Sequence, residues 1–262
     1  MTGTGPGTGE SPAAAFKRRL LARETLLGVF VKIPHPAVIE VLAGAGLDCL
    51  CLDAEHAPFD RGDLDRCILA ARAHGLAVLV RTPSAEAHHI LNALDLGASG
   101  VLVPHIRTGA EAAAVARAAH YGPGGRGYAG ATRASGFISP PIGARLAQAR
   151  AETTVIVQIE DIEALDQVEA IAGAEGVDAV FIGRIDLTVA LGETDPKAPR
   201  VKAAVNDICD RARHADAAVG LFTPDIAEVP DWRTRGASLF LLGSDQGFLK
   251  AGAEKLRLDA GL

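Results

Sequence analysis

The sequence has few cysteines, and their spacing argues against a disulfide scaffold. Only four occur among 262 residues, and no Cys-x-x-Cys pair is present. Cys49 and Cys51 lie two positions apart on one expected strand, which is poor geometry for a disulfide. Cys67 and Cys209 fall in helical patterns. We therefore expect buried free thiols and a location in the reducing cytoplasm.

Long apolar runs and an excess of positive charge are also absent. No apolar run reaches the roughly 18 residues of a membrane-spanning helix. The net charge is −6 and the isoelectric point is near 5.8. The chain thus lacks the basic surface that binds nucleic acids or anionic membranes, and we expect neither partner. Its one basic cluster is expected to be a solvated helix face, and it comprises Lys17, Arg18, Arg19 and Arg23.

The first residues differ in composition from the rest. The segment "MTGTGPGTGESPAAA" has no positive stretch followed by an apolar one, so a secretory signal is not expected. Its Gly, Thr and Pro content predicts a disordered leader over residues 1–15. No linker interrupts the remainder, and residues 16–262 are expected to form one domain.

Short apolar runs alternate with helical patterns throughout this domain. The expected strands are Leu26–Val31, Leu50–Asp53, Val78–Arg81, Gly100–Val103, Val155–Ile159, Ala179–Gly183, Ala218–Phe222 and Leu239–Gly243. The helical patterns are Pro36–Ala45, Leu64–His74, Ala85–Leu96, Glu111–His120, Glu163–Ile171, Val201–His214, Pro224–Arg235 and Gln246–Leu258. Strands that are apolar on both faces indicate a parallel sheet covered by helices. Eight such units predict a single (β/α)8 TIM barrel, with a doubly wound open sheet as the alternative.

A long Gly-rich loop, "YGPGGRGYAGATRASGF", follows the fourth helical pattern. Gly122, Gly124 and Gly127 fit a dinucleotide-binding GxGxxG motif, but no strand leads directly into it. We favour a mobile loop over the site that carries Arg126 and Arg133.

Polar residues gather at the carboxyl-terminal ends of the expected strands, where barrel enzymes place catalytic groups. The stretch "CLCLDAEHAPFD" ends the second strand with Asp53, Glu55 and His56. The following strands end with Arg81, Pro104 and His105, Gln158 and Glu160, Gly183 to Asp186, Thr223 and Pro224, and Ser244 and Asp245. The pattern predicts one ring of acids, an arginine and a histidine around one mouth.

Glu160 and Asp186 end adjacent strands, and such a carboxylate pair suits an oxygen-binding divalent cation. The alternative is that each pairs with an arginine or caps a helix. Arg81 ends a buried strand and must meet an anion, either an internal carboxylate or a substrate oxygen. His56 could be a plain loop histidine, and Asp95 a surface acid.

The motifs resemble a known family. "LDAEHAPFD", "VRTPS", "LDLGASGVLVPHIRT", "VQIED" and "AVFIGRIDL" occur in the order seen in the HpcH/HpaI aldolases. These are metal-dependent class II pyruvate aldolases, such as 4-hydroxy-2-oxoheptanedioate aldolase and 2-dehydro-3-deoxyglucarate aldolase. The resemblance runs from about Leu26 to Lys250.

The resemblance implies a role for individual residues. Glu160 and Asp186 match the metal ligands, His56 matches the catalytic base, and Asp95 matches the partner of that base. Arg81 matches the enolate-stabilising arginine, Gln158 lies at the pyruvate position, and Asp53 matches a supporting acid. The pyruvate carboxylate is expected against the backbone N–H groups of Ile185 and Asp186. The metal would be Mg²⁺, Mn²⁺ or Co²⁺, and the family implies a homo-oligomer, trimeric or hexameric, that exchanges its last helix.

One departure from the family lies beside the metal position. The family has Gly-Pro-x-Asp-Leu where this chain has Gly183, Arg184, Ile185, Asp186 and Leu187. We hypothesise that Arg184 selects an acidic aldehyde. The alternative is that it turns outward to pair with a surface acid such as Glu193 or Asp195.

The implied reaction is reversible cleavage of a 4-hydroxy-2-oxo acid into pyruvate and an aldehyde, through pyruvate enolate. Three alternatives remain. A Schiff-base aldolase would need a desolvated lysine, for which Lys32 is the candidate. An acyl-CoA lyase of the citrate lyase beta subunit type would share the acid pair. The last alternative is a non-catalytic barrel.

Overall fold

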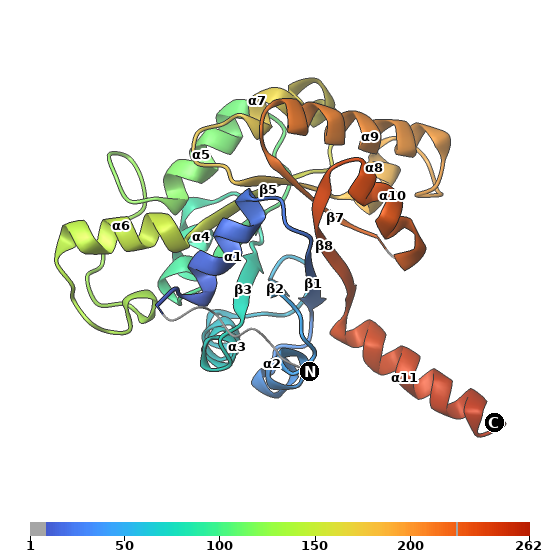
Figure 1. Cartoon of the computed structure of the whole chain (residues 1–262), viewed down its shortest axis with the longest axis horizontal. Helices are drawn as coiled ribbons and strands as arrows, with labels where there is room; N and C mark the ends of the chain where they lie inside the picture. Colours follow the sequence, from blue (N-terminus) through green and yellow to red (C-terminus); the bar gives the residue numbers. More distant parts are fainter. Residues whose placement is uncertain (1–8, 224) are drawn as a thin grey trace.

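The computed structural model, which describes residues 9–223 and 225–262, contains eight parallel strands in a closed barrel (Figure 1). They are β1 (Leu26–Val31), β2 (Cys49–Asp53), β3 (Ala77–Arg81), β4 (Gly100–Val103), β5 (Thr154–Ile159), β6 (Ala179–Ile182), β7 (Ala218–Phe222) and β8 (Ala237–Ser244). Each strand pairs with its sequence neighbour, and β8 pairs with β1. The barrel prediction is confirmed, and the open sheet is excluded.

Helices connect the strands on the outside of the barrel. They are α1 (Pro12–Leu21), α2 (Pro36–Ala43), α3 (Arg61–Ala73), α4 (Ala87–Asp95), α5 (Gly109–Ala119), α6 (Ile142–Glu152), α7 (Val168–Ala172), α8 (Arg184–Ala190), α9 (Pro199–His214), α10 (Val229–Thr234) and α11 (Asp245–Asp259). Short 3₁₀ segments span Arg133–Ser135, Ile162–Gln167 and Ile226–Glu228. The helix α6 was not predicted. The expected helix Glu163–Ile171 is a 3₁₀ segment followed by the short α7.

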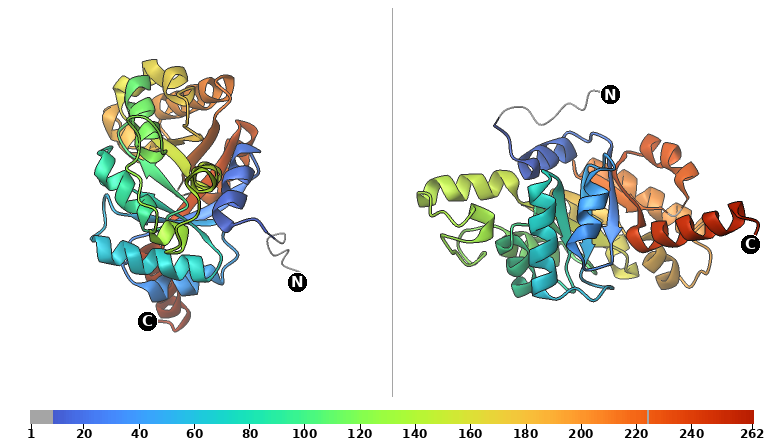
Figure 2. Two further views of the ribbon diagram at one scale, coloured as in Figure 1. Left: turned by 90° about the vertical axis from the view of Figure 1, so that its left-hand side faces the viewer. Right: turned by 90° about the horizontal axis from the view of Figure 1, so that it is seen from below.

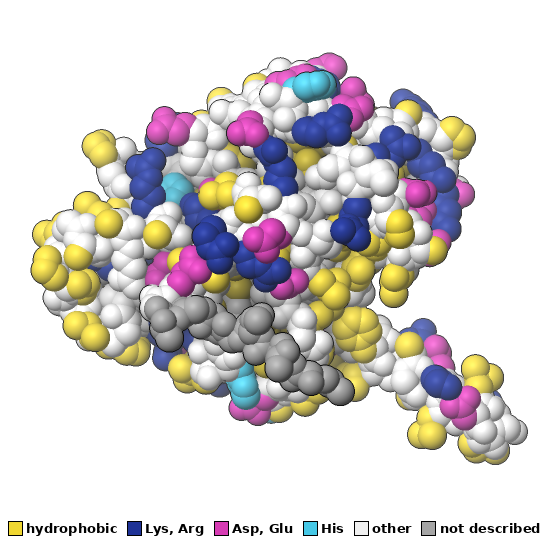
Figure 3. All heavy atoms as spheres, viewed as in Figure 1, with side chains coloured by type: hydrophobic (Ala, Val, Ile, Leu, Met, Phe, Trp, Pro, Cys, Tyr) yellow, Lys and Arg dark blue, Asp and Glu magenta, His cyan; other side chains and the backbone are white. Residues whose placement is uncertain are grey.

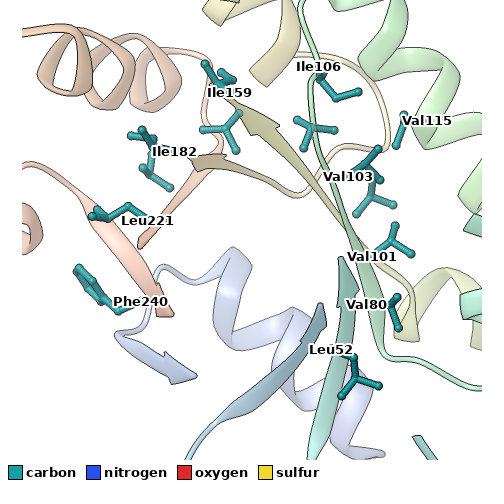
Figure 4. Packing of buried hydrophobic residues seen from close by; sticks show 14 of the residues in the cluster. Leu52, Val80, Val101, Val103, Ile106, Val115, Ile159, Ile182, Leu221 and Phe240 are labelled. Atoms are coloured by element: carbon teal, nitrogen blue, oxygen red, sulfur yellow. The ribbon is translucent and has the colours of Figure 1, made fainter. Parts of the chain in front are cut away.

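The apolar strands supply two packed layers. Residues such as Leu52, Val80, Val101 and Ile182 point outward and pack against the helices (Figure 4). The other face of the strands fills the barrel interior, where Phe181 lies among aliphatic side chains. Every residue of β2 and β3 is buried, which explains why these strands read as continuous apolar runs.

Helix α1 corrects the predicted leader. It begins at Pro12, so residues 12–15 are helical, while residues 1–8 lie outside the described residues. Ser11 caps the helix by accepting a hydrogen bond from Ala14 N–H at 3.2 Å, and proline is favoured at a first helical position. Phe16 and Leu20 belong to the same apolar cluster as the barrel interior. Burial of these two side chains, which composition does not reveal, holds the helix in place.

The Gly-rich segment does not lie over the barrel mouth, which is a second correction. It connects α5 to α6 and packs against α3 and α4. Arg126 forms a buried ion pair with Asp95 of α4. Arg133 donates two hydrogen bonds to Asp65 of α3, at 2.8 and 2.9 Å. Both arginines are therefore engaged on the outer wall of the barrel.

Helix α11 extends away from the barrel as an arm (Figures 1 and 2). Within it, only Asp245 is buried. Among the described residues, no helix is long and apolar enough to cross a membrane.

The four cysteines are buried free thiols, as predicted. Burial raises the pKa of Cys67 to about 11 and that of Cys209 to about 12, and it raises the pKa of Cys49 and Cys51 strongly. A buried thiol held in its protonated form is a poor nucleophile.

We therefore predict that a disulfide reagent such as DTNB leaves the native protein unmodified at pH 8 and titrates all four cysteines in guanidinium chloride. Absorbance of the released thiolate measures both numbers. Fast stoichiometric reaction of any thiol in the native protein would contradict the burial described above.

Candidate active site

A cavity of about 370 Å³ opens at the carboxyl-terminal ends of the strands. Its apolar wall is formed by Phe30, Phe181 and Phe222 from β1, β6 and β7. The polar lining comes from the predicted ring, and it comprises His56, Arg81, Gln158, Arg184 and Asp186, together with Lys32; Ile185 also lines the cavity. The sequence thus located the mouth correctly.

A buried ion pair between Asp53 and Arg81 forms the floor on the β2–β3 side. Arg81 donates from Nε to Oδ1 at 3.0 Å and from Nη2 to Oδ2 at 2.8 Å, a bidentate arrangement. The parallel register pairs these two residues across the strands, so the contact follows from strand order. The guanidinium also lies 4.7 Å above the Phe30 ring, which limits its movement.

Asp53 anchors two further groups. Its Oδ1 accepts a hydrogen bond from the backbone N–H of His56 at 3.1 Å, and Lys32 Nζ lies 3.4 Å from Oδ2. Burial opposes the charged form of Asp53, but the hydrogen bonds and charge of Arg81 outweigh it, and the pKa of Asp53 is lowered. Lys32 therefore meets a carboxylate, unlike the desolvated lysine that a Schiff-base enzyme needs.

Glu160 is buried at the end of β5, opposite this pair. Burial raises the pKa of its carboxyl group, and the charge of Asp186 acts in the same direction. Its Oε1 accepts the backbone N–H of His105 at 2.9 Å, and its Oε2 accepts from Gln158 Nε2. A Cβ on Gly183 would lie 2.7 Å from Glu160 Cβ and 2.8 Å from Gln158 Nε2, so only glycine leaves room for this arrangement.

Glu55 and His105 join Glu160 in a cluster that the sequence analysis did not assign. Ligand atoms of the three residues all lie within 4.8 Å of one another. Burial raises the pKa of Glu55 as well. Both residues stand at strand ends in the sequence, so their position signalled them. What the sequence could not show is that they face Glu160.

The oxygen-rich surroundings of Glu160 fit a divalent cation. Oε1 of Gln158 is buried without a hydrogen-bond partner, and so is Oε2 of Glu55, which lies 3.3 Å from Arg81 Nε. Buried oxygens of this kind normally have a partner, and the Glu55 and Glu160 carboxyl groups have raised pKa values that a nearby cation would reverse. The set is rich in carboxylate and amide oxygens, which suits Mg²⁺ or Mn²⁺.

Asp186 and Ile185 stand in the first turn of α8, directly after Gly183, and both line the cavity. The first N–H groups of a helix have no partner within that helix. The structure therefore places the predicted carboxylate-binding N–H groups and the predicted metal ligand Asp186 at the same mouth.

Comparison with known proteins agrees with this geometry. The model of the HpcH/HpaI aldolase/citrate lyase family matches residues 26–251. The chain belongs to this family. A 4-hydroxy-2-oxovalerate aldolase from Rhodococcus jostii is 39% identical over 92% of this chain and 93% of that protein. A 5-keto-4-deoxy-D-glucarate aldolase from Salmonella arizonae is 36% identical over 92% and 94%. A solved family protein from Burkholderia cenocepacia superposes with a TM-score of 0.88 at 34% identity, covering 95% and 100% of the two chains. Family membership and these relatives identify an enzyme of the aldolase and lyase type.

The sequence predicted that Asp95 contacts His56, and within this HpcH/HpaI chain that prediction is wrong. Helix α4 runs back from the mouth, and Asp95 is its last residue, shortly before β4 begins at the opposite end of the barrel. There it pairs with Arg126. The acid beside the ring of His56 is Glu55, with Oε2 at 3.6 Å from Nε2.

Arg184 also differs from both expectations. Its side chain is buried, Nε and Nη2 donate to the carbonyl of Pro196 at 2.9 and 2.7 Å, and the guanidinium pairs with Glu228. It also stacks on Trp232 at 5.4 Å. A guanidinium held in this way uses four of its five N–H donors on Pro196 and Glu228, and its partner is neither Glu193 nor Asp195. The specificity hypothesis is not supported.

Replacement of Asp53 tests the importance of its ion pair with Arg81. We predict that Asp53→Asn lowers the free energy of unfolding at pH 7 by about 3 kcal/mol, because it removes the bidentate carboxylate from buried Arg81 and leaves Glu55, 3.3 Å from Arg81 Nε, as its remaining anion. The pKa of Asp53 is lowered in the folded state, so its stabilisation is present above the unfolded-state pKa and is lost as pH falls through the folded-state value.

Urea unfolding at pH 7 and near pH 3 measures the difference between wild type and Asp53→Asn, which should shrink at the lower pH. Asp259→Asn, on exposed α11, is the control and should change little at either pH. An Asp53→Asn effect of the same size at both pH values would contradict the lowered pKa.

Proposed function

We propose that this HpcH/HpaI protein is a class II aldolase that reversibly cleaves 4-hydroxy-2-oxo acids into pyruvate and an aldehyde. The observation that carries the proposal is a fixed guanidinium, Arg81, in one cavity with Asp186 and with Gln158, which donates to the buried carboxylate of Glu160. The names of two relatives, 4-hydroxy-2-oxovalerate aldolase and 5-keto-4-deoxy-D-glucarate aldolase, support the same substrate class.

Glu160 and Asp186 would hold the divalent cation, which can be Mg²⁺, Mn²⁺ or Co²⁺. When bound, the cation would supply Lewis-acid stabilisation of negative charge on the 2-oxo group. Gln158 is buried beside this position: it donates from Nε2 to Oε2 of Glu160, and its Oε1 has no hydrogen-bond partner. We place the pyruvate carboxylate against the N–H groups of Ile185 and Asp186.

Arg81 would stabilise the enolate. Asp53 neutralises the resting guanidinium and fixes its plane, so little reorganisation is needed when charge develops on the substrate. Such fixed donors lower the barrier chiefly because they bind the transition state better than the ground state.

His56 would take the proton from the 4-hydroxyl group. Its ring is half exposed at the rim while its backbone N–H is held by Asp53. This arrangement keeps the imidazole at a defined position and leaves it accessible to substrate or to a bridging water. Glu55, rather than Asp95, is the acid that can influence it within one chain.

We further propose that the protein is a cytoplasmic homo-oligomer in which α11 packs on a neighbouring subunit. Figure 3 shows apolar side chains on the surface of the arm. The exposed large apolar residues of α11 are Phe248, Leu249, Leu256 and Leu258, at 46, 63, 70 and 75%. An isolated helix with such apolar residues gains little stability from its own chain. The four free thiols support a reducing compartment.

Metal dependence is tested by chelation. We predict that exhaustive EDTA treatment abolishes pyruvate release from 4-hydroxy-2-oxo acids and that Mn²⁺ or Mg²⁺ restores it. Glu160→Gln should lose both the activity and the metal affinity measured by calorimetry, since an amide cannot replace the charged ligand.

The same assay discriminates the alternatives. Unchanged turnover after chelation, with borohydride trapping of pyruvate that Lys32→Ala abolishes, would establish the Schiff-base mechanism instead. Turnover of acyl-CoA thioesters without cleavage of hydroxy-oxo acids would establish the acyl-CoA lyase.

The role of His56 predicts a split between two reactions. His56→Ala should slow aldol cleavage by roughly 100-fold or more, the usual contribution of a general base. Proton exchange at the methyl group of pyruvate, followed by NMR in D₂O, involves no 4-hydroxyl and should be less affected. Arg81→Ala should reduce both reactions. Equal losses of the two reactions in His56→Ala would place the histidine elsewhere in the mechanism.

A further inference from the structure

The cavity at the barrel mouth has a half that the proposed pyruvate position does not use. Pyruvate and the cation would occupy the side of β3, β5 and β6, where Arg81, Gln158 and Asp186 line the cavity. The rest of the lining comes from the ends of β1, β7 and β8 and from the start of α11, and it comprises Phe30, Lys32, Phe222, Gly243, Ser244 and Gly247. At about 370 Å³ the whole cavity is near the lower end of the range of about 300–1,000 Å³ for small-molecule sites, so a second substrate bound there must be short.

Lys32 is the one charged side chain among the described residues that line this half. The backbone that carries it is held from below by Asp245, a buried acid at the start of α11. The N–H groups of Lys32 and Ile33 donate to the two carboxylate oxygens of Asp245, at 2.9 and 2.8 Å. A side chain that extends from a fixed backbone loses less freedom when it binds a ligand.

The ammonium group of Lys32 has donors that its carboxylate partner does not need. Nζ lies 3.4 Å from Oδ2 of Asp53, an oxygen that already accepts from Arg81 Nη2 at 2.8 Å. Lys32 is therefore a second cation beside one carboxylate. Among the residues that the structure describes, Asp53 is the one acid within 4.0 Å of Nζ. A lysine ammonium group carries three N–H donors, and this side chain is 31% exposed at the mouth.

The aldehyde portion of the substrate would extend toward this lysine. His56 follows β2 and would take the proton from the 4-hydroxyl group, so C4 of the substrate lies on the β2 side. Strand β1 is the neighbour of β2 in the barrel, and β8 is the neighbour of β1. A group attached to C4 points away from the bound pyruvate and therefore enters the half lined by Phe30, Lys32 and Phe222.

Given the proposed function, on which this inference rests, we propose that Lys32 is a specificity-determining residue that binds a carboxylate at the far end of the aldehyde portion. Nζ would donate a charge-assisted hydrogen bond to this carboxylate, while the rings of Phe30 and Phe222 contact the short carbon chain. The favoured substrates are then 4-hydroxy-2-oxo acids with a second carboxylate. Lys32 takes the role that the sequence suggested for Arg184.

Pairs of aldehydes with the same shape test this preference in the condensation direction. Glyoxylate is compared with 2-methylpropanal, and 4-oxobutanoate with 4-methylpentanal, so that an isopropyl group replaces a carboxylate in each pair. Pyruvate and Mn²⁺ are kept saturating, and NMR follows the product. We expect Lys32→Met to lower the acid-over-neutral ratio of kcat/KM about tenfold or more for at least one pair, because a hydrogen bond to a charged group is lost. Comparison of the ratio between variants cancels the intrinsic reactivity of the aldehydes.

Two further variants are controls. Lys32→Arg keeps a cation at this position and should retain the preference for the acid. Lys202→Met removes an exposed lysine of α9 that does not line the cavity, and it should leave the ratio unchanged.

The kinetic constants separate a specificity role from a structural one. The carboxylate is remote from the bond that forms, so its loss of binding should appear mainly in the KM of the acidic aldehyde. A disturbance of Asp53 and Arg81 would instead lower kcat for both members of a pair and slow proton exchange at the methyl group of pyruvate.

An unchanged ratio in Lys32→Met for both pairs, or equal losses for the acidic and the neutral aldehyde, would overturn the inference and leave the aldolase proposal intact. If wild type condensed pyruvate with none of the four aldehydes and showed no metal-dependent proton exchange at pyruvate, both proposals would be overturned.

Discussion

The pairing of Asp53 with Arg81 is the interaction on which the rest of the site depends. A guanidinium buried at a strand end is costly unless an anion meets it, and here two hydrogen bonds from adjacent strands provide that anion. The same carboxylate holds the His56 backbone and lies beside Lys32. Asp53 thus contacts the Arg81 guanidinium, the backbone of His56 and the Lys32 ammonium group. Loss of this charge would disturb each of them together, and of the described acids only Glu55, 3.3 Å from Arg81 Nε, would remain as an anion beside the guanidinium.

The two sides of the cavity have opposite electrostatic character. On the β2–β3 side the acid is compensated, and the pKa of Asp53 is lowered. On the β4–β5 side burial raises the pKa of Glu160, with Glu55 nearby in the same condition. The buried acids Glu55 and Glu160 would attract a metal cation. The fixed guanidinium of Arg81 would attract negative charge that develops on a substrate. Metal-assisted enolate chemistry requires both.

Arg184 and Asp95 have other partners than the sequence predicted, and both differences have local physical causes. The guanidinium of Arg184 is taken up by the carbonyl of Pro196 and by Glu228, because a cation buried there needs several acceptors. Asp95 ends a helix that runs away from the mouth, five residues before β4 begins at Gly100, so within one chain it is not a neighbour of His56. A motif match predicts which residue type stands at a position, whereas the contacts of that residue depend on the folded structure.

The sequence by itself determined the barrel, the strand order and the mouth, because apolar strands with polar carboxyl-terminal ends leave few other arrangements. It also predicted Arg81, Glu160 and Asp186 as site residues, since each follows or ends a strand. Contacts between residues distant in the chain were decided by the tertiary structure alone. These include α1 packing Phe16 and Leu20 with the barrel interior, the engagement of Arg126 with Asp95, and the convergence of Glu55, His105 and Glu160. The physical reason is that local pattern specifies which face a residue occupies, while side-chain partners depend on packing and charge in three dimensions.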